Sequence, residues 1–180
     1  MLADLDFAKA VEARRALRIP GYATLTDAGL DGPWTTPYQI ASRSADGPVL
    51  LTYNYLDAPS ARMHREQLLA QGFLPGMPFN AVLDRALAKC GMRRSDLYVT
   101  HAFHLLPATR SASIRSGDVD ISFDTVARHE LSGRKVVALG AVAARVCARH
   151  GIAHIATPHP SARGLSFAQR AEALAAAMRR

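Results

Sequence analysis

The sequence predicts an α/β fold, a three-layer α/β/α sandwich around a four-stranded parallel sheet. Two observations predict it. Apolar, β-branched runs of strand length alternate four times with segments of helical periodicity, and this alternation produces parallel strands covered by helices on both faces. The chain has 180 residues, 49% of them hydrophobic, which is enough for one domain with its own core. We therefore expect a single domain over residues 1–180.

The first 47 residues lead into this alternation. Residues 4–18 have the pattern of a short helix, and Pro20 and Gly21 end it. Residues 19–47 are rich in Gly, Pro, Thr and Ser, a composition typical of irregular structure. An N-terminal helix and an irregular segment are therefore expected over residues 1–47.

The alternating part begins after Pro48. Strands are expected at residues 49–55, 97–103, 135–139 and 152–156. Helices are expected at residues 61–71, 80–90, 121–131 and 140–150, and a last helix is expected from residue 166 onward. Asn80 is the expected N-cap of the second of these helices and Gly91 its stop. Ser166 and Gln169 form a capping box for the last helix, whose buried stripe is expected to begin at Phe167.

Composition narrows the class of protein. No stretch reaches the roughly 18 apolar residues of a membrane span, and the N-terminus lacks the pattern of a signal peptide, so a cytoplasmic location is expected. Cys90 and Cys147 are too few for a four-cysteine metal site, and both are expected to be buried free thiols. The net charge of +7 favours a partner with a phosphate backbone.

Polar side chains stand where the expected strands end, and in a parallel sheet the ligand lies beyond the carboxyl ends of the strands. These side chains are Asn54, Asp57, His101, His104 and His159. His159 lies between Pro158 and Pro160, which restrict the backbone on either side of it. A stiff loop of this kind suits a catalytic side chain, although a surface turn has the same local pattern.

Four segments carry a resemblance to a known family. They are Gly76-Met77-Pro78-Phe79, Leu97–Thr100 with the following His101, Val136–Ala144, and Thr157–Ser161 with the small residues after it. In this order and spacing, over residues 47–166, they resemble the motifs of the uracil-DNA glycosylase superfamily, and family 4 most of all. The resemblance implies a DNA glycosylase that hydrolyses the N-glycosidic bond of uracil, or of another deaminated or modified base, flipped out of DNA.

The resemblance also implies a role for each matching residue. His159 would hydrogen-bond O2 of the base and stabilise the charge of the leaving group. Phe79 would stack on the base, with Tyr55 as a further base contact. In the loop after the last strand, Ser161, Arg163 and Leu165 would contact DNA, with Arg163 on phosphate and Leu165 filling the gap left by the base. A core position for Phe79, and packing of Leu165 on the last helix, are the alternatives.

The first motif departs from the family pattern. One alignment makes Asp57 the acidic residue of this motif, and the other makes Asn54 its amide. The sugar becomes cation-like as the bond breaks, and a carboxylate stabilises such a charge better than an amide does, so Asp57 is preferred. An ordinary turn at Asp57 is the alternative.

The central strand departs as well. His101 stands where the family has Asn; a neutral imidazole has one donor and one acceptor, but they point in opposite directions. His104 is expected to be a packing residue. The four cysteines of the family 4 iron–sulfur cluster are missing, so we expect no metal and no cofactor. Because of these departures, uracil is the leading candidate for the excised base, and other modified bases stay open.

Two other functions stay open at this point. A glycosylase fold that binds DNA or a nucleotide without cleavage would fit the altered first motif. An unrelated enzyme acting on a small molecule has less support, because no glycine-rich phosphate loop follows the first strand.

Overall fold

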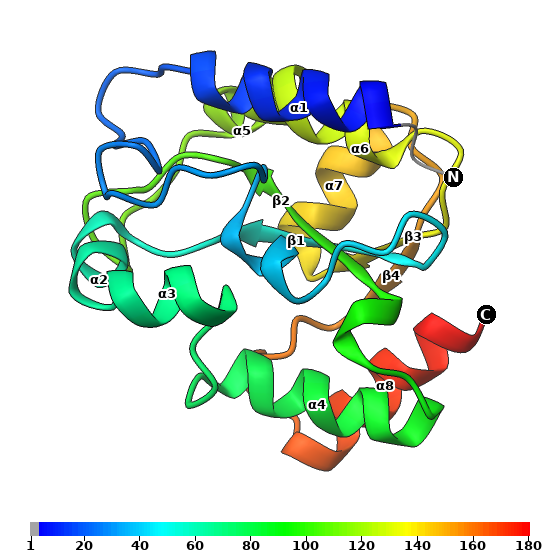
Figure 1. Cartoon of the computed structure of the whole chain (residues 1–180). Helices are drawn as coiled ribbons and strands as arrows, with labels where there is room; N and C mark the ends of the chain where they lie inside the picture. The colour runs from blue at the N-terminus through cyan, green and yellow to red at the C-terminus, as the bar shows by residue number, and fades with distance from the viewer. Residues whose placement is uncertain (1–3) are drawn as a thin grey trace.

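A computed structural model describes residues 4–180 and contains the expected parallel sheet (Figure 1). Its strands are β1 (Val49–Asn54), β2 (Tyr98–Phe103), β3 (Val136–Leu139) and β4 (Ile155–Thr157). All neighbouring strands are parallel, in the spatial order β2-β1-β3-β4. The predicted fold class is therefore confirmed, with each strand within three residues of its expected start.

Helices connect and cover the strands. They are α1 (Asp4–Ala16), α2 (Ala58–Met63), α3 (Arg65–Gln71), α4 (Pro78–Cys90), α5 (Ser116–Ser122), α6 (Arg128–Leu131), α7 (Ala141–Arg149) and α8 (Phe167–Arg179). A 3-10 turn spans Pro37–Ile40, a second spans Arg94–Asp96, and a π-helical segment, Phe123–Ala127, joins α5 to α6. No helix within residues 4–180 is both long and apolar enough to cross a membrane.

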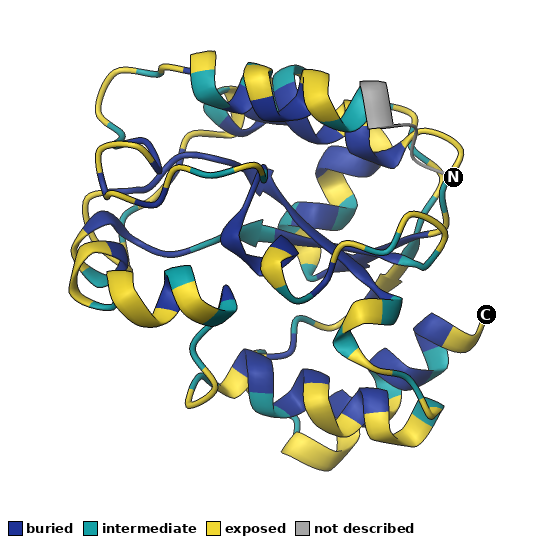
Figure 2. Ribbon diagram, viewed as in Figure 1, coloured by how far each residue is buried: buried dark blue, intermediate teal, exposed yellow. Residues whose placement is uncertain are grey.

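Most of the helices form two layers, one on each face of the sheet, whereas α2 and α3 pack in a separate cluster to one side (Figure 1). On one face α1, α5, α6 and α7 pack against Val49 and Leu51 of β1, and on the other α4 and α8 pack against Leu50. Successive residues of a strand point to opposite faces, so a strand that is covered on both sides is apolar throughout. This is why β2, β3 and the first residues of β1 are buried and appear dark blue in Figure 2, whereas the edge strand β4 is partly exposed.

The strand order places a topological switch between β1 and β3. From β1 the chain moves outward to β2, then returns to the other side of β1 for β3 and continues to β4. Connections leave neighbouring strands in opposite directions at such a point, and a crevice forms beyond their carboxyl ends. The ends of β1 and β3 are therefore where the fold itself favours a ligand site.

Two sequence-based expectations about helices are wrong. Helix α4 begins at Pro78 with Met77 as N-cap, because Pro is well suited to the first helical turn; Asn80 lies inside that turn and donates to the carbonyl of Leu74 at 2.8 Å. Phe167 is 39% exposed, because it packs under the guanidinium of Arg170, 4.5 Å from the ring centre, instead of entering the core.

Other expectations hold in part. Gly91 ends α4 with a left-handed backbone, and the Ser166–Gln169 capping box forms. The helical region expected from residue 121 already begins at Ser116 and is interrupted by the π-helical segment. Cys147 is buried, whereas Cys90 is only half-buried.

Candidate active site

A pocket of about 540 Å³ lies at the carboxyl ends of β1, β3 and β4. All the residues predicted as catalytic or base-binding line it, as does Ser161: His159, Asp57, Asn54, Phe79, His101 and Tyr55 are in its wall. Arg163 and Leu165 are outside the wall. The structure thus brings together side chains that are far apart in the chain, such as Thr52 and His159, which are 107 residues apart.

Two neighbours determine which ring nitrogen of His159 carries hydrogen. The main-chain N–H of Ser161 donates to its Nδ1 at 3.1 Å, so Nδ1 must carry a lone pair. Its Nε2 lies 3.1 Å from the hydroxyl oxygen of Thr52 and is therefore the nitrogen that carries hydrogen. Burial lowers the pKa of His159. The imidazole is thus neutral and presents an N–H donor at the pocket wall.

Gly140 makes room for this histidine. It follows β3, has φ of +88°, and an added Cβ would lie 3.0 Å from Cβ of His159. Only glycine adopts this backbone conformation without strain. Glycine after Leu139 therefore allows the loop after β4 to approach the end of β3.

Aromatic rings surround the two pocket histidines. The ring centre of Phe79 is 5.6 Å from that of His159, and Tyr55 is 5.6 Å from His101. Tyr38 lies 5.8 Å from both Phe79 and His101. Phe79 is 5% exposed and packs in the core, the alternative position for it, while it also lines the pocket.

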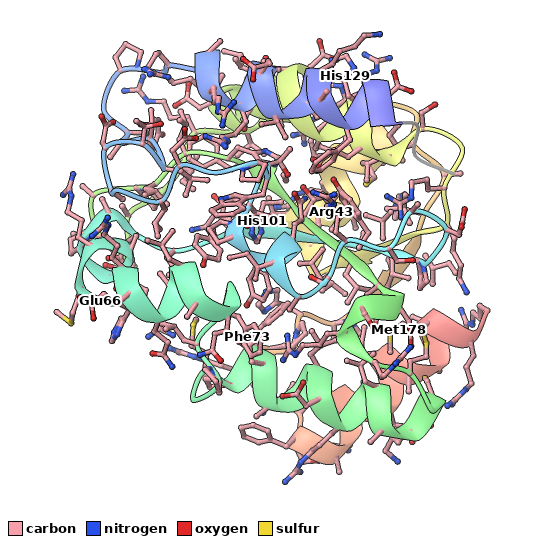
Figure 3. All side chains as sticks on the ribbon, in the orientation of Figure 1. Arg43, Glu66, Phe73, His101, His129 and Met178 are labelled. Atoms are coloured by element: carbon pink, nitrogen blue, oxygen red, sulfur yellow. The ribbon has the colours of Figure 1, made fainter. Side chains whose placement is uncertain are left out.

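His101 lies on β2, near the middle of the molecule (Figure 3). Its Nε2 is 3.0 Å from the hydroxyl oxygen of Thr36, and its Nδ1 has no hydrogen-bond partner within residues 4–180. Burial, with smaller contributions from His104 and His159, lowers the pKa of His101 well below its ordinary value. His101 is therefore a neutral side chain with one unused nitrogen.

The two first-motif candidates have different surroundings. Asp57 is the N-cap of α2: one carboxylate oxygen accepts from the Ser60 N–H and the other from the Ser60 hydroxyl, both at 2.9 Å. Asn54 ends β1 in the pocket wall, and its side-chain amide forms no hydrogen bond with residues 4–180. Both side chains line the pocket. The carboxylate of Asp57 is engaged by Ser60, whereas the amide of Asn54 is available to a ligand.

A buried carboxylate that contacts side chains of β2 was not predicted. Glu130, fully buried, accepts hydrogen bonds from Tyr98 (2.5 Å), Thr35 (2.7 Å) and Thr100 (2.7 Å), and His104 lies 3.5 Å away. Burial alone would raise the pKa of Glu130, but the interactions with His104 and the hydroxyl groups lower it. Glu130 lies seven residues after Phe123 and so falls on the apolar face of the expected helix. A carboxylate on that face was the indication in the sequence that Glu130 is buried.

The rim of the pocket is polar and basic. Arg110, which sequence reasoning missed, lies in the pocket wall and is exposed. In the loop after β4, Ser161 and Arg163 are exposed and Leu165 is half-buried. This loop is in reach of solvent beside the pocket, as a segment that contacts a large ligand must be.

Comparisons with known proteins give no match from which a function for this pocket could be inferred. No protein-family model matches the chain, and a search of curated proteins finds no match. Within residues 4–180, no three side chains of the metal-ligating types gather closely enough to hold an ion.

Proposed function

We propose that the protein is a DNA glycosylase similar to the uracil-DNA glycosylases, which hydrolyses the N-glycosidic bond of uracil or another deaminated or modified base. One observation carries the proposal. The neutral His159, with Nδ1 engaged by the Ser161 amide and Nε2–H at the wall of an aromatic pocket, is suited to stabilise an anionic leaving group. A preorganised donor is most effective in such a water-poor site.

The proposed reaction begins with a base that has left the DNA stack. The base enters between the rings of Phe79 and Tyr55, where stacking compensates for its lost neighbours. As the bond from C1′ to the base nitrogen breaks, its electron pair stays on the base. The Nε2–H of His159 leaves Thr52 and donates to the carbonyl oxygen on which that charge gathers.

Water completes the reaction at the sugar. Its oxygen bonds to the cation-like C1′, and the proton it loses passes to the departing base or to solvent. Asn54, whose amide is free, or Asp57 positions this water. The reaction consumes only water and needs no metal or organic cofactor.

The basic surface supports DNA as the partner. The net charge is +7, and Arg110 and Arg163 are exposed beside the pocket; such charges bind phosphate and release counterions. We also propose a cytoplasmic location, since Cys90 and Cys147 are both free thiols, as is usual in a reducing compartment.

A second candidate function is recognition of DNA without cleavage. The observation that favours it is the hydrogen bonding of Asp57, whose carboxylate caps α2. Among the described residues of the pocket wall, Asp57 is the sole acidic side chain. If its carboxylate serves the helix alone, the site binds a base but has less stabilisation to offer the sugar cation.

Base release from defined oligonucleotides tests the proposal. Single- and double-stranded DNA with uracil, hypoxanthine, xanthine or a bulkier modified base is incubated with the protein, and free base and alkali-labile sites are measured. We expect release of at least one of these bases. Binding that weakens with salt, without release of any base, would reject the enzyme and favour the second candidate.

Two substitutions separate the candidates for the first motif. Asp57→Ser keeps a capping oxygen, since Ser is also a good N-cap, but removes the carboxylate. Loss of activity in this variant with retained stability would assign the catalytic role to Asp57. Loss in Asn54→Ala, with Asp57→Ser still active, would assign it to Asn54.

A further inference from the structure

Arg170 is a charged residue on the buried side of α8. It lies four residues before Leu174 on the buried stripe of this helix and is itself 8% exposed. A buried guanidinium is costly unless hydrogen bonds satisfy it. Both side-chain hydrogen bonds of Arg170 within residues 4–180 end on main-chain carbonyl oxygens: Nη1 donates to Pro160 at 2.6 Å, and Nε donates to Ser166 at 3.3 Å.

These two carbonyl groups stand at the two ends of the loop between β4 and α8, the orange segment that leads into α8 in Figure 1. One guanidinium therefore holds together both ends of the largely exposed segment 161–165. The ring of Phe167 covers this guanidinium, with Cζ of Arg170 4.5 Å from the ring centre. This contact explains why Phe167 stays at the surface although its ring is apolar.

The bond from Arg170 to Pro160 reaches His159 through a single peptide group. The carbonyl of Pro160 and the N–H of Ser161 belong to the same trans peptide, which is planar, so they point in opposite directions. The carbonyl accepts from Arg170, and the N–H donates to Nδ1 of His159 at 3.1 Å. A guanidinium that orients this carbonyl therefore also orients the N–H toward the imidazole.

The peptide between Pro160 and Ser161 needs this support. It is the central peptide of a turn that the Ala162 N–H closes on the carbonyl of His159 at 2.8 Å. The closing bond does not fix the central peptide, since turns of different types differ in its orientation. Ser161 is also exposed, so water competes for its N–H. The bond to Nδ1 therefore depends on what holds the carbonyl side of the peptide.

We infer that Arg170 is a positioning residue, which acts through the Pro160–Ser161 peptide and holds the imidazole of His159 in its donor orientation. The charge of the guanidinium polarises the peptide, which makes the N–H of Ser161 a stronger donor. The inference rests on the proposed function only where it concerns the rate of base release, because the hydrogen bonds themselves are present without a ligand.

Hydrogen exchange of single main-chain amides tests the arrangement in the protein alone. In the wild type we expect the Ser161 amide to exchange at least about tenfold more slowly than an unprotected amide. Arg170→Met removes every donor of the side chain and is expected to abolish this protection. It should also move the ¹⁵N shift of Nδ1 of His159 toward that of a nitrogen without a hydrogen bond. The Ala162 amide stays protected, because the turn itself remains.

The matched control is Arg85→Met. Arg85, on α4, has its Cζ 5.8 Å from the centre of the same Phe167 ring but forms no side-chain hydrogen bond within residues 4–180. Its replacement is expected to leave the exchange of the Ser161 amide unchanged. Arg170→Lys, which keeps the charge and a donor, is expected to restore part of the protection that Arg170→Met loses.

Kinetics of base release from an oligonucleotide separate positioning from binding. Arg170→Met is expected to lower kcat about tenfold, the worth of one hydrogen bond, with KM within about twofold of the wild type. Arg170→Lys recovers part of kcat, and Arg85→Met retains the wild-type rate. A rise in KM at unchanged kcat would assign Arg170 to DNA binding and overturn the positioning role.

The outcomes distinguish this inference from the proposed function. A Ser161 amide without protection in the wild type would overturn the inference even if DNA is cleaved, and it needs no variant to fold. Full protection of Ser161 in Arg170→Met, or loss of protection at Ala162 as well, would also overturn it, since Arg170 would then be dispensable or merely hold the loop together. The expected exchange pattern in a protein that releases no base would support the inference and reject the glycosylase.

Discussion

The main-chain N–H of Ser161 lies 3.1 Å from Nδ1 of His159 and fixes the tautomer of that histidine from two residues further along the chain. Pro158 and Pro160 flank the histidine and restrict the backbone around it. A short segment therefore carries both the side chain and the group that orients it.

Replacement of His159 by alanine is expected to slow base release strongly. It removes the Nε2–H that would meet the leaving group, and loss of one such donor costs roughly 3–4 kcal/mol of barrier. Single-turnover rates on an oligonucleotide substrate measure the effect. His129→Ala is the control, since His129 is exposed on α6 and lies away from the pocket (Figure 3). A wild-type rate in His159→Ala would remove the centre of the proposal.

The pH dependence of the rate should reveal a neutral histidine. Burial lowers the pKa of His159 from its ordinary value of 6.5, so the neutral form persists as the pH falls through 6.5. We expect the rate of base release to stay level through this value and to fall only in more acidic solution, where Nδ1 gains a proton and loses the bond from Ser161. A rate that rises as the pH falls through 6.5 would indicate a protonated histidine acting as an acid.

Gly140→Ala is expected to disturb His159 from a neighbouring position in the pocket wall. The added Cβ meets Cβ of His159 at 3.0 Å, and φ of +88° is unfavourable for alanine, at a cost of about 1–2 kcal/mol in the free energy of unfolding. The loop after β4 must shift, so the rate falls as well.

The matched control for this change is Gly117→Ala. Gly117 lies in α5 with open space around the position of its Cβ, and alanine favours a helix over glycine by about 1 kcal/mol. Urea unfolding and single-turnover rates compare the two variants. Equal stability and equal rates in both would contradict the role given to Gly140.

Glu130→Gln tests the buried network around Glu130. Tyr98 donates to one carboxylate oxygen and Thr100 to the other. Glutamine replaces one of these acceptors by a donor, so one of the two hydroxyl groups loses its acceptor. Breaking a buried charged network of this kind costs about 3 kcal/mol, measured as the free energy of unfolding in urea. Glu172→Gln, at an exposed carboxylate of α8, is expected to leave stability nearly unchanged. A similarly small effect at Glu130 would show that the network contributes little.

The sheet could be predicted because β1, β2 and β3 are largely covered on both faces. Leu50 and Leu51 point to opposite helical layers and are both buried, so β1 begins with an apolar run, Val49–Leu51. The start of α4 was less certain, since Pro78 and Asn80 both favour the first positions of a helix and local sequence does not decide between them.

The pocket was predictable only as far as it lies on strand ends. His101 and His159 follow that rule, because the sheet itself brings them together. Thr36 and Tyr38 come from the irregular N-terminal segment and contact His101 of β2 through tertiary packing, and Tyr38 also lines the pocket. The local sequence of such a segment contains no periodicity from which its approach to a strand 65 residues away could be inferred.

Leu165→Ala is expected to distinguish double-stranded from single-stranded DNA. Leu165 is half-buried in the loop that carries Ser161 and Arg163, next to Gly164 with its left-handed φ of +82°. If the side chain enters the duplex where the base has left, its truncation removes apolar contact that single strands do not need. The rate on duplex substrate should then fall by about tenfold, with little change on single strands. Arg163→Ala is the comparison, because loss of a phosphate contact weakens binding of both substrates and lowers its salt dependence. Equal losses on both substrates for Leu165→Ala, together with reduced stability, would instead show that the side chain serves the packing of α8.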